Sequence, residues 1–512
     1  MQRKWWTLSV VCIATFMLLL DITIVNVALP KIAADLKASF SDIQWVIDAY
    51  ALTLASVLLT TGTLGDLLGR RLVFSIGLVL FAFTSLLCAI STSSLFLILA
   101  RGGQGLGGAI MYSTSLALLV QEFHGRERGT ALGIWGATIG AAAAVGPLVG
   151  GVLTEALGWS SIFYINVPIG IGAAALTLAR VDESRNPDAG KIDWIGTFTF
   201  TAALFLLMLA IIRGNAQGWG SAPIVADFVA SAVLLVAFLI SQVVQEQPMF
   251  DLKLFRNPTF DGAAIVALTL AAAMFAMFLY LALYVQTLLG YSPLQTGLRF
   301  LPVTVLSFFV AALSGNLSAR VPVRLLLSGG LLLVGLGELL MRGLSPNSHW
   351  TALLAGFIVA GAGVGLVNPA LASTAVGVVP PQRSGMASGI NNTFRQVGVA
   401  AGIAVLGALF ESSLTTKIAP KLAGTPVAGQ AGKLAHAVAA GGTQSVLHHT
   451  PAAVRPQATT AIHTAFAAAM NDILLVGALI AFAGGALALL LVRGSDFAVY
   501  RAPEPAAAPA GG

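Results

Sequence analysis

Three ionisable residues stand inside apolar stretches of the first quarter of the chain: Asp21 in "LLLDITIVNVALP", Asp48 in "WVIDAY" and Arg101 in "LILARGGQGLGGA". In a lipid bilayer such residues are costly unless they pair or meet water, so each one suggests a function. Arginine stays charged at any working pH, whereas a carboxylate can bind a proton when it leaves a cationic partner. These residue types therefore predict proton binding and ion pairing.

The elements that must position these residues are membrane spans. The chain has 512 residues, of which 57% are hydrophobic and 9% are charged, whereas soluble proteins are roughly a quarter charged. Its mean hydropathy is +0.89. Apolar runs long enough to cross a hydrocarbon core of about 30 Å recur from end to end. We predict fourteen spans, at approximately 6–29, 44–64, 72–90, 95–120, 129–153, 162–181, 194–213, 226–245, 262–288, 298–319, 323–342, 350–376, 386–410 and 466–492.

The composition argues against several other classes of protein. "MQRKWW" and the run after it could be a secretory signal, but the run is too long and no small-x-small cleavage site follows. The net charge of +6 reflects Lys and Arg in the loops of one side, which predicts cytoplasmic termini and needs no nucleic-acid partner. Cys12 and Cys88 lie in predicted spans, so no disulfide or metal site is expected. Because no Gly-x-x-x-x-Gly-Lys motif occurs, we expect no cofactor, and an ion gradient would supply the energy.

Asp21 and Arg101 are predicted to lie at a similar depth. Asp21 is about nine residues, or roughly 13 Å, from the outer end of its span, and Arg101 and Asp48 also lie in the outer half of theirs. We expect Asp21 and Arg101 to form the proton switch, because Arg101 holds Asp21 ionised only while the two touch. Gln104 shares the helix face of Arg101. The alternative is a static ion pair that fastens spans one and four.

Three motifs of the first half of the chain recur in the second half. The pairs are "GTLGDLLGRR" (62–71) with "GNLSARVPVR" (315–324), "RGTALGI" (128–134) with "RSGMASGI" (383–390), and "RGGQGLG" (101–107) with "FIVAGAG" (357–363). Such repeats are typical of transporters and predict two six-helix bundles in parallel, with one helix pair left over between them. The copies differ where Asp66 corresponds to Ala319 and Arg101 to Phe357.

In this order the motifs resemble the Major Facilitator Superfamily, and within it the fourteen-helix drug:proton antiporter family of EmrB/QacA type. "LDITIVNVALP" is similar to that family's first-helix motif, "GTLGDLLGRR" to the superfamily's loop motif and "VGPLVGG" to its fifth-helix antiporter motif. The resemblance covers nearly the whole chain. It implies an all-α polytopic membrane protein with the major facilitator fold, built from two six-helix bundles plus two inserted transmembrane helices.

Domain boundaries follow from this architecture. We expect the first bundle at 1–190, the inserted helix pair and its loop at 191–250, and the second bundle at 251–495. The second bundle would contain a long extracytoplasmic loop at 411–465. Residues 496–512 are expected to be a disordered cytoplasmic tail.

The loop motif implies a latch on the cytoplasmic side. The carboxylate of Asp66 can accept hydrogen bonds from free backbone N–H groups at the helix start of Ser384 and Gly385. Arg70 and Arg71 would add ion pairs that hold the two bundles together. The alternative is a plain basic loop. The residues assigned to the latch are Gly62, Asp66, Gly69, Arg70, Arg71 and Ser384.

The fifth span carries the antiporter motif. Its small residues allow close helix contact, and its proline lacks an N–H and favours a bend. Ordinary small-residue packing explains the same pattern, but the resemblance implies export. The motif residues are Gly146, Pro147, Gly150 and Gly151.

Polar residues elsewhere are candidates for substrate binding. Asp48 stands where the family's exporters of lipophilic cations carry an acid, although an acid that merely meets water near the outer interface is the alternative. Glu338 and Asp472 lie near outer helix ends and are expected to reach water. The residues assigned to substrate binding are Asp48, Asn26, Gln104, Tyr280, Asn391, Arg395 and Gln396.

These expectations converge on a proton-coupled antiporter that exports lipophilic, cationic or broadly mixed small molecules across the cell membrane by alternating access. It would work as a monomer in the lipid bilayer, without a cofactor. One alternative is a dedicated exporter of a single metabolite, a self-made antibiotic or a lipid. Less favoured alternatives are a proton symporter for uptake and a transport-dead sensor or scaffold.

Overall fold

The computed structural model describes residues 3–38, 40–185, 193–245, 248, 250–318, 320–380, 383–422, 431–439, 450–451 and 454–497. Within these ranges every regular element is a helix and no strand occurs. Thirteen helical segments are long and apolar enough to cross a membrane. Helix α5 (Gly125–Leu157), with 33 residues, is long enough to supply a fourteenth crossing. The prediction of an all-helical polytopic membrane protein is confirmed.

The helices of the first half follow the predicted spans. They are α1 (Arg3–Asp35), α2 (Phe40–Leu68), α3 (Arg70–Ala89), α4 (Ser94–Glu122), α5, α6 (Ser161–Tyr164) and α7 (Asn166–Arg180). Only Ile165 separates α6 from α7, and together they form the sixth predicted span. Helices α8 (Trp194–Gln217) and α9 (Ala222–Val244) follow.

The ninth predicted span is a helix interrupted by two π-helical segments, which are wider than an α-helix and often occur at functional sites. It consists of α10 (Pro258–Leu270), η2 (Ala271–Phe275), α11 (Ala276–Leu283) and η3 (Tyr284–Leu288). The remaining helices are α12 (Pro293–Leu317), α13 (Val323–Leu340), α14 (Leu354–Gly377), α15 (Ser384–Ile418), α16 (Ala431–Ala439) and α18 (Arg455–Leu491).

Polar residues and glycines mark several helix boundaries. Ser93, Asp193 and Asn257 accept hydrogen bonds from the first backbone N–H groups of α4, α8 and α10, which satisfies donors that have no partner inside the helix. Gly158 and Gly218 follow α5 and α8 with φ of 86° at both positions. This left-handed conformation favours glycine and ends a helix.

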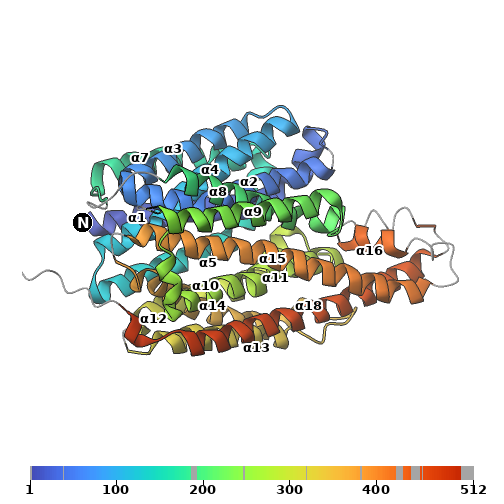
Figure 1. Cartoon of the computed structure of the whole chain (residues 1–512). Helices are drawn as coiled ribbons and strands as arrows, with labels where there is room; N and C mark the ends of the chain where they lie inside the picture. Colours follow the sequence, from blue (N-terminus) through green and yellow to red (C-terminus); the bar gives the residue numbers. More distant parts are fainter. Residues whose placement is uncertain are drawn as a thin grey trace, which may run out of the picture.

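Both ends of the described chain lie on the same side of the helical bundle (Figure 1). There the backbone N–H of Arg493 donates to the Thr259 hydroxyl at the start of α10, over 2.8 Å. We call this the termini side, and we call the opposite side, which carries α16, the loop side.

Buried apolar side chains form separate cores in the two halves. The largest core draws only on residues between 263 and 492. A second core draws on residues between 8 and 181, together with Ala372 and Val376 of α14. Helix α8 packs on α9 and lies against α2 and α15, with Met208 buried beside Leu52 and Ala55. The inserted pair therefore lies along one seam between the halves.

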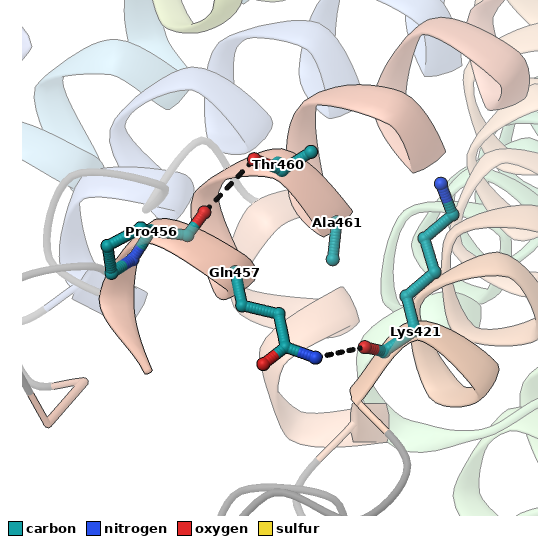
Figure 2. Close-up of a pocket in the computed structure, with 5 residues that line it drawn as sticks. All are labelled: Lys421, Pro456, Gln457, Thr460 and Ala461. Carbon is teal, nitrogen blue, oxygen red and sulfur yellow. Dashed lines mark hydrogen bonds between the residues drawn. The ribbon is translucent and has the colours of Figure 1, made fainter. Parts of the chain in front are cut away.

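The helices on the loop side extend further than the sequence indicated. Helix α15 continues to Ile418 and α18 begins at Arg455, so helical structure occupies both ends of the stretch predicted as the loop 411–465. The two extensions support each other, because Gln457 donates to the Lys421 carbonyl over 3.1 Å. Figure 2 shows the depression between them, lined by Lys421, Pro456, Gln457, Thr460 and Ala461. Residues 423–430, 440–449 and the tail beyond residue 497 lie outside the described residues.

Candidate functional site

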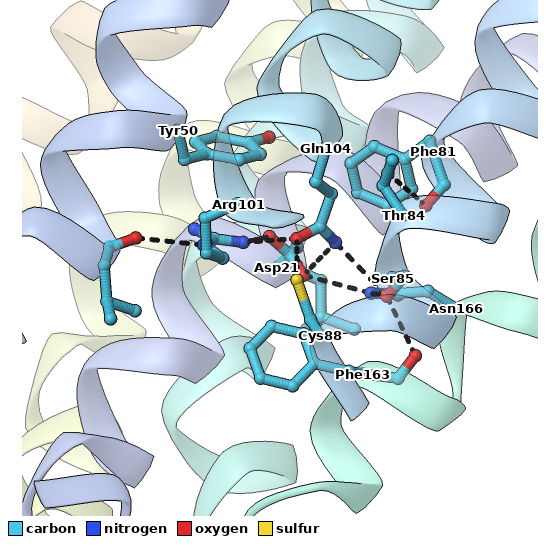
Figure 3. A network of polar contacts seen from close by, with 12 residues as sticks. Asp21, Tyr50, Phe81, Thr84, Ser85, Cys88, Arg101, Gln104, Phe163 and Asn166 are labelled. Carbon is cyan, nitrogen blue, oxygen red and sulfur yellow. Dashed lines mark hydrogen bonds and ion pairs between the residues drawn. The ribbon is translucent and has the colours of Figure 1, made fainter. Parts of the chain in front are cut away.

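Asp21 and Arg101 form an ion pair in the interior of the first bundle (Figure 3). An Nη1–H of Arg101 donates to Asp21 Oδ2 over 2.6 Å. Each residue is only 1% exposed. The two residues that the sequence placed at a similar depth are therefore in direct contact.

The second carboxylate oxygen of Asp21 is also satisfied. Gln104 Nε2 donates to Asp21 Oδ1 over 2.9 Å, and Asn166 Nδ2 donates to the same oxygen over 3.0 Å. Both amides also donate to the hydroxyl of Ser85, over 3.2 and 3.1 Å. That hydroxyl in turn donates to the Phe163 carbonyl over 2.9 Å. We call Asp21, Ser85, Arg101, Gln104 and Asn166 the Asp21 network.

Arg101 has further partners that fix its position. Its Nε–H donates to the Val46 carbonyl over 3.1 Å, and Nη1 also donates to Gln104 Oε1 over 2.6 Å. Its guanidinium lies over the ring of Tyr50, 4.2 Å from the ring centroid, in a cation–π contact. A buried ion pair persists only where such additional bonds offset the loss of water. The network thus joins α1, α2, α3, α4 and α7 at one point, where the two charges offset each other and both carboxylate oxygens of Asp21 accept hydrogen bonds.

Two members of the network escaped the sequence prediction. Asn166 lies within "IFYINVPIG", but nothing in its type or spacing distinguished it from a surface amide. Ser85 gave no signal at all, because a serine in an apolar helix usually bonds its own backbone. Gln104 was assigned to substrate binding, yet it is 0% exposed and its described contacts are internal to the first bundle. We therefore assign Gln104 to the Asp21 network.

The latch aspartate contacts the second half as expected. The backbone N–H of Gly385 donates to Asp66 Oδ1 over 3.2 Å, and that of Met386 donates to Oδ2 over 2.9 Å. The contact thus lies at the start of α15, one residue beyond the predicted pair of Ser384 and Gly385. Asp66 is 6% exposed.

The described ion pairs of the loop arginines lie within the first half, whereas the sequence predicted ion pairs that hold the two bundles together. Arg70 pairs with Asp66 over 2.8 Å, and Arg71 pairs with Glu183 over 3.7 Å. All of these residues belong to the first half, so these ion pairs brace the loop within one bundle. Glu183 also accepts from the backbone N–H groups of Arg71 and Leu72 at the start of α3. Gly69 precedes them with φ of +115°, where a side chain would meet Glu183.

Two glycine pairs bring the halves into backbone contact on the termini side. A Cβ on Gly62 would lie 2.5 Å from the Gly385 carbonyl oxygen. At the symmetry-related position, a Cβ on Gly315 would lie 2.1 Å from the Gly129 carbonyl oxygen. Side chains larger than hydrogen therefore do not fit at either place. In this conformation the termini side is closed.

Helix α5 connects this interface with the helix of Asp21. Near the termini side its Gly129 meets α12, and on the loop side its Gly146 and Gly150 meet α1. A Cβ on Gly146 would lie 1.8 Å from Thr23 Oγ1, and one on Gly150 would lie 2.8 Å from Ile24. Gly151 has open space around it, and the side chain of Pro147 lies outside the described residues.

The polar residues of the second bundle do not form one stripe. Arg395 donates to Asn368 Oδ1 over 2.9 Å and lies 3.5 Å from the Tyr112 hydroxyl of α4, so it spans the interface between the halves. Its guanidinium also lies over the Phe275 ring at 4.8 Å. Asn391 turns away from Arg395 toward the Ala263 carbonyl of α10, over 3.5 Å.

The other predicted substrate residues are dispersed. Tyr280 is buried and donates to the Ile403 carbonyl over 2.7 Å, and Gln396 is half-buried on α15. Asp48 is half-buried on α2, and no hydrogen bond or ion pair from another described residue reaches its carboxylate. The side chain of Asn26 lies outside the described set.

The two acids near the loop-side helix ends behave differently. Asp472 reaches the surface, where it pairs with Lys417 over 2.5 Å. Glu338 is 0% exposed, and neither carboxyl oxygen has a hydrogen-bond partner in the described part of the chain. The expectation that Glu338 meets water is wrong, because Gly477 of α18 packs directly over its carboxyl group. No cluster of His, Cys, Asp or Glu suited to a metal occurs among the described residues.

Comparison with known proteins identifies relatives of the chain. The family model described as Major Facilitator Superfamily matches residues 11–403. The multidrug resistance protein Stp of Mycobacterium tuberculosis (strain CDC 1551 / Oshkosh) is 36% identical over 417 residues, which cover 81% of this chain and 78% of Stp. The probable actinorhodin transporter of Streptomyces coelicolor is 36% identical over 421 residues, which cover 80% and 72% of the two chains.

A solved structure gives the same fold. The human organic anion transporter MFSD10 (TETRAN) matches with a TM-score of 0.58, over 93% of this chain and 99% of that chain. At 16% identity this likeness concerns the fold alone. The helical architecture, the match to the family model and the relatives agree, and the chain belongs to the Major Facilitator Superfamily, whose members are membrane transporters and not enzymes.

Proposed function

We propose that this chain is a proton-coupled antiporter that exports lipophilic, cationic or broadly mixed small molecules from the cell. The relatives include a protein named for multidrug resistance and one named as a probable actinorhodin transporter, which supports export of drugs or similar small molecules. The names of these relatives do not mention proton coupling or a preference for cations. Support for both comes from the geometry of the buried charges.

The Asp21 network is the observation that carries the proposal. A buried ion pair seldom stabilises a fold more than apolar residues of the same volume would. A purely structural role therefore does not explain why five helices contact one buried ion pair. When Arg101 leaves, Asp21 would lose its cationic partner in a dry site, and its carboxylate would then bind a proton. Proton binding and release are thereby tied to the distance between α1 and α4.

Helix α5 supports a link between this distance and transport. It touches α12 through Gly129 and α1 through Gly146. The residue of α1 that Gly146 touches is Thr23, two positions after Asp21. Rocking of the bundles against each other would break the Gly129–Gly315 and Asp66 contacts on the termini side, and α5 would carry the motion to α1. We assign the termini side to the cytoplasm, where Lys and Arg accumulate, so the conformation described is closed to the cytoplasm.

Asp48 supports the preference for cations. Its carboxylate has no partner in the described part of the chain, and Trp45, one turn away, offers an aromatic face. A lipophilic cation leaving the cytoplasm could use both through charge and cation–π contact. We expect the protein to act as a monomer surrounded by lipid.

A second candidate is the dedicated export of one self-made antibiotic. Arg395 favours it, because its guanidinium lies at the interface between the halves, next to the Phe275 ring and the Tyr112 hydroxyl. Such a site suits an acidic aromatic compound better than a cation. Competition between ethidium and an acidic aromatic antibiotic in the assay below separates the two candidates.

The test uses inverted membrane vesicles. An imposed proton gradient should drive accumulation of the fluorescent cation ethidium in vesicles that contain the wild-type chain. Asp21→Asn should abolish accumulation, but it also leaves Arg101 buried without a counter-ion, which costs about 3–5 kcal/mol. The double variant Asp21→Asn with Arg101→Gln removes both charges and avoids this cost, and it too should fail to couple.

Asp472→Asn is the matched control, because it neutralises a surface carboxylate far from the network. It should transport like the wild type. Proton-driven accumulation that survives in the double variant would show that the Asp21 network only fastens helices.

A further inference from the structure

Glu338 is a buried acid that lies in an apolar site inside the second bundle. It is 0% exposed, and within the described part of the chain neither of its carboxyl oxygens has a hydrogen-bond partner. A Cβ on Gly477 of α18 would lie 2.4 Å from Glu338 Oε2 and 3.0 Å from the Met277 methyl group of α11. The carboxyl group therefore fills the space that Gly477 leaves between α13, α11 and α18.

The internal repeat relates this site to the Asp21 network. In the first half Gly107 packs against the backbone of Gly77 and Phe81. In the second half Gly363 packs in the same way against Gly330 and Val334. Positions 77 and 81 therefore correspond to 330 and 334, and both pairs differ by 253. The same difference relates Ser85, the hydroxyl shared by the network amides, to Glu338.

The donors of the network have no counterparts in the second half. Gly107 and Gly363 differ by 256, and this offset relates Arg101 to Phe357 and Gln104 to Ala360. Gly477 faces Glu338 as Asn166 faces Ser85. The second bundle thus has a carboxyl group where the first has a serine, and it lacks the arginine and both amides.

Among the described residues, no charged group bonds to the carboxyl group of Glu338. Arg324 lies on α13 and Arg342 just beyond its end. The titratable and charged side chains on the elements packed around this site are Asp261, Tyr280, Tyr284, Arg455, His463 and Asp472. Helix α14 contains no such side chain. Asp472 pairs with Lys417 at the surface, and Arg342 donates to the Asn471 carbonyl over 3.1 Å. None of them bonds to Glu338 among the described contacts.

An ionised carboxylate without partners in such a site is very unfavourable, whereas the neutral acid is tolerated. We propose that Glu338 is a reversible proton-binding site of the second bundle, the counterpart of the Asp21 network, and that it holds a proton in the conformation described. The proposal rests on the proposed proton coupling and adds a second site to it. In the first bundle the proton is displaced by Arg101, and in the second the proton itself neutralises the acid.

The structure also contains a barrier between Glu338 and the loop side. Helix α13 ends two residues later, at Leu340, and Asn471 of α18 holds the segment that follows. Asn471 Oδ1 accepts from the backbone N–H groups of Gly343 and Leu344 over 2.9 and 3.0 Å, and its Nδ2 donates to the Leu344 carbonyl over 2.9 Å. Release of these bonds would let water reach Glu338, so the proton would enter and leave from the loop side.

Infrared difference spectroscopy on the purified protein tests the proposal without any transport assay. The wild type should show a carbonyl-stretch band of a protonated carboxyl group that disappears reversibly as the pH is raised. The band should be missing in Glu338→Gln and also in Glu338→Met, which fills the same space with an apolar side chain. Asp472→Asn should keep it. A spectrum that Glu338→Gln leaves unchanged, or a band that persists at every pH at which the protein stays folded, overturns the proposal.

A second measurement places the proton in the transport cycle. In proteoliposomes loaded with a pH-sensitive dye, Glu338→Gln should move one proton fewer per ethidium than the wild type. An unchanged ratio overturns the role of Glu338 in coupling, although the proposed function would stand. Absence of ethidium transport by the wild type would instead refute the proposed function, and the infrared titration would still report on Glu338.

Discussion

The Asp66 latch should be the main contact that keeps the termini side closed, and Asp66→Asn should open it. The carboxylate accepts two backbone hydrogen bonds from the start of α15, over 3.2 and 2.9 Å. Hydrogen bonds to a charged group are worth about 1.5–3 kcal/mol each. In the Asp66→Asn variant the side-chain oxygen could still accept one hydrogen bond, now as a neutral group. The side-chain NH₂ group would face the second backbone N–H and could not accept from it. Arg70 belongs to the same half as Asp66, so its ion pair changes little between the open and closed states.

The expected loss is therefore about 2–3 kcal/mol of closed-state stability, which changes the ratio of closed to open molecules by about 30- to 150-fold. Spin labels at Leu72→Cys on α3 and Leu325→Cys on α13 can measure this by double electron–electron resonance. Both positions are exposed, at 46% and 48%, and they are related by the internal repeat. Asp66→Asn should add a population with a longer distance between the labels.

The control is Asp472→Asn, an acid-to-amide change on the loop side, which should leave the distances unaltered. Labels on Leu72→Cys alone account for background from Cys12 and Cys88. If the distance distribution of Asp66→Asn equals that of the wild type, the two backbone hydrogen bonds do not hold the closed state and the argument fails.

Three further predictions follow from the contacts. Gly146→Ala should abolish transport, because its Cβ would lie 1.8 Å from Thr23 Oγ1, whereas Gly151→Ala should be tolerated, because nothing lies within 4 Å; equal uptake of ethidium by vesicles of both variants would contradict this. Gly315→Ala should open the termini side, seen as the same longer label distance, because its Cβ would lie 2.1 Å from the opposing carbonyl oxygen. Asp48→Asn should reduce export of cations more than that of neutral drugs, and equal losses in a paired transport assay would argue against charge recognition.

Much of the fold could be predicted because each span must bury its own backbone polar groups in a helix. Apolar runs therefore located the spans, and the repeated motifs related the two halves. The ends of α15 and α18 could not be predicted in this way. Helix α15 continues beyond its apolar run through the polar stretch "ESSLTTKI", and α18 begins before its apolar run with "RPQATTAIHTA". These two ends support each other through contacts such as that of Gln457 with Lys421.

The Asp21–Arg101 contact could be predicted because a charged side chain in an apolar helix is costly without a partner. The similar depth of the two residues in the membrane then limited the number of possible partners. Ser85 and Asn166 could not be predicted, since neutral polar side chains carry no such demand for a partner. The ion pair of Arg71 could not be predicted, because the sequence does not reveal that Glu183, over a hundred residues later, approaches the start of α3.

Glu338 shows the limit of counting residues from a helix end. By that measure it lies near the loop side, where its long side chain could reach water. Its burial depends on Gly477, which belongs to another helix and admits the carboxyl group into the core. Only the packing of α13 on α18 reveals this.

Proton coupling is tested most directly by the exchange of protons for substrate by the purified chain alone. In proteoliposomes without any other protein, an imposed pH gradient should drive ethidium in one direction while a trapped pH-sensitive dye records protons moving in the other. The two fluxes should start together, and both should vanish in the double variant Asp21→Asn with Arg101→Gln. Ethidium movement that proceeds at the same rate with no counterflow of protons would contradict proton coupling.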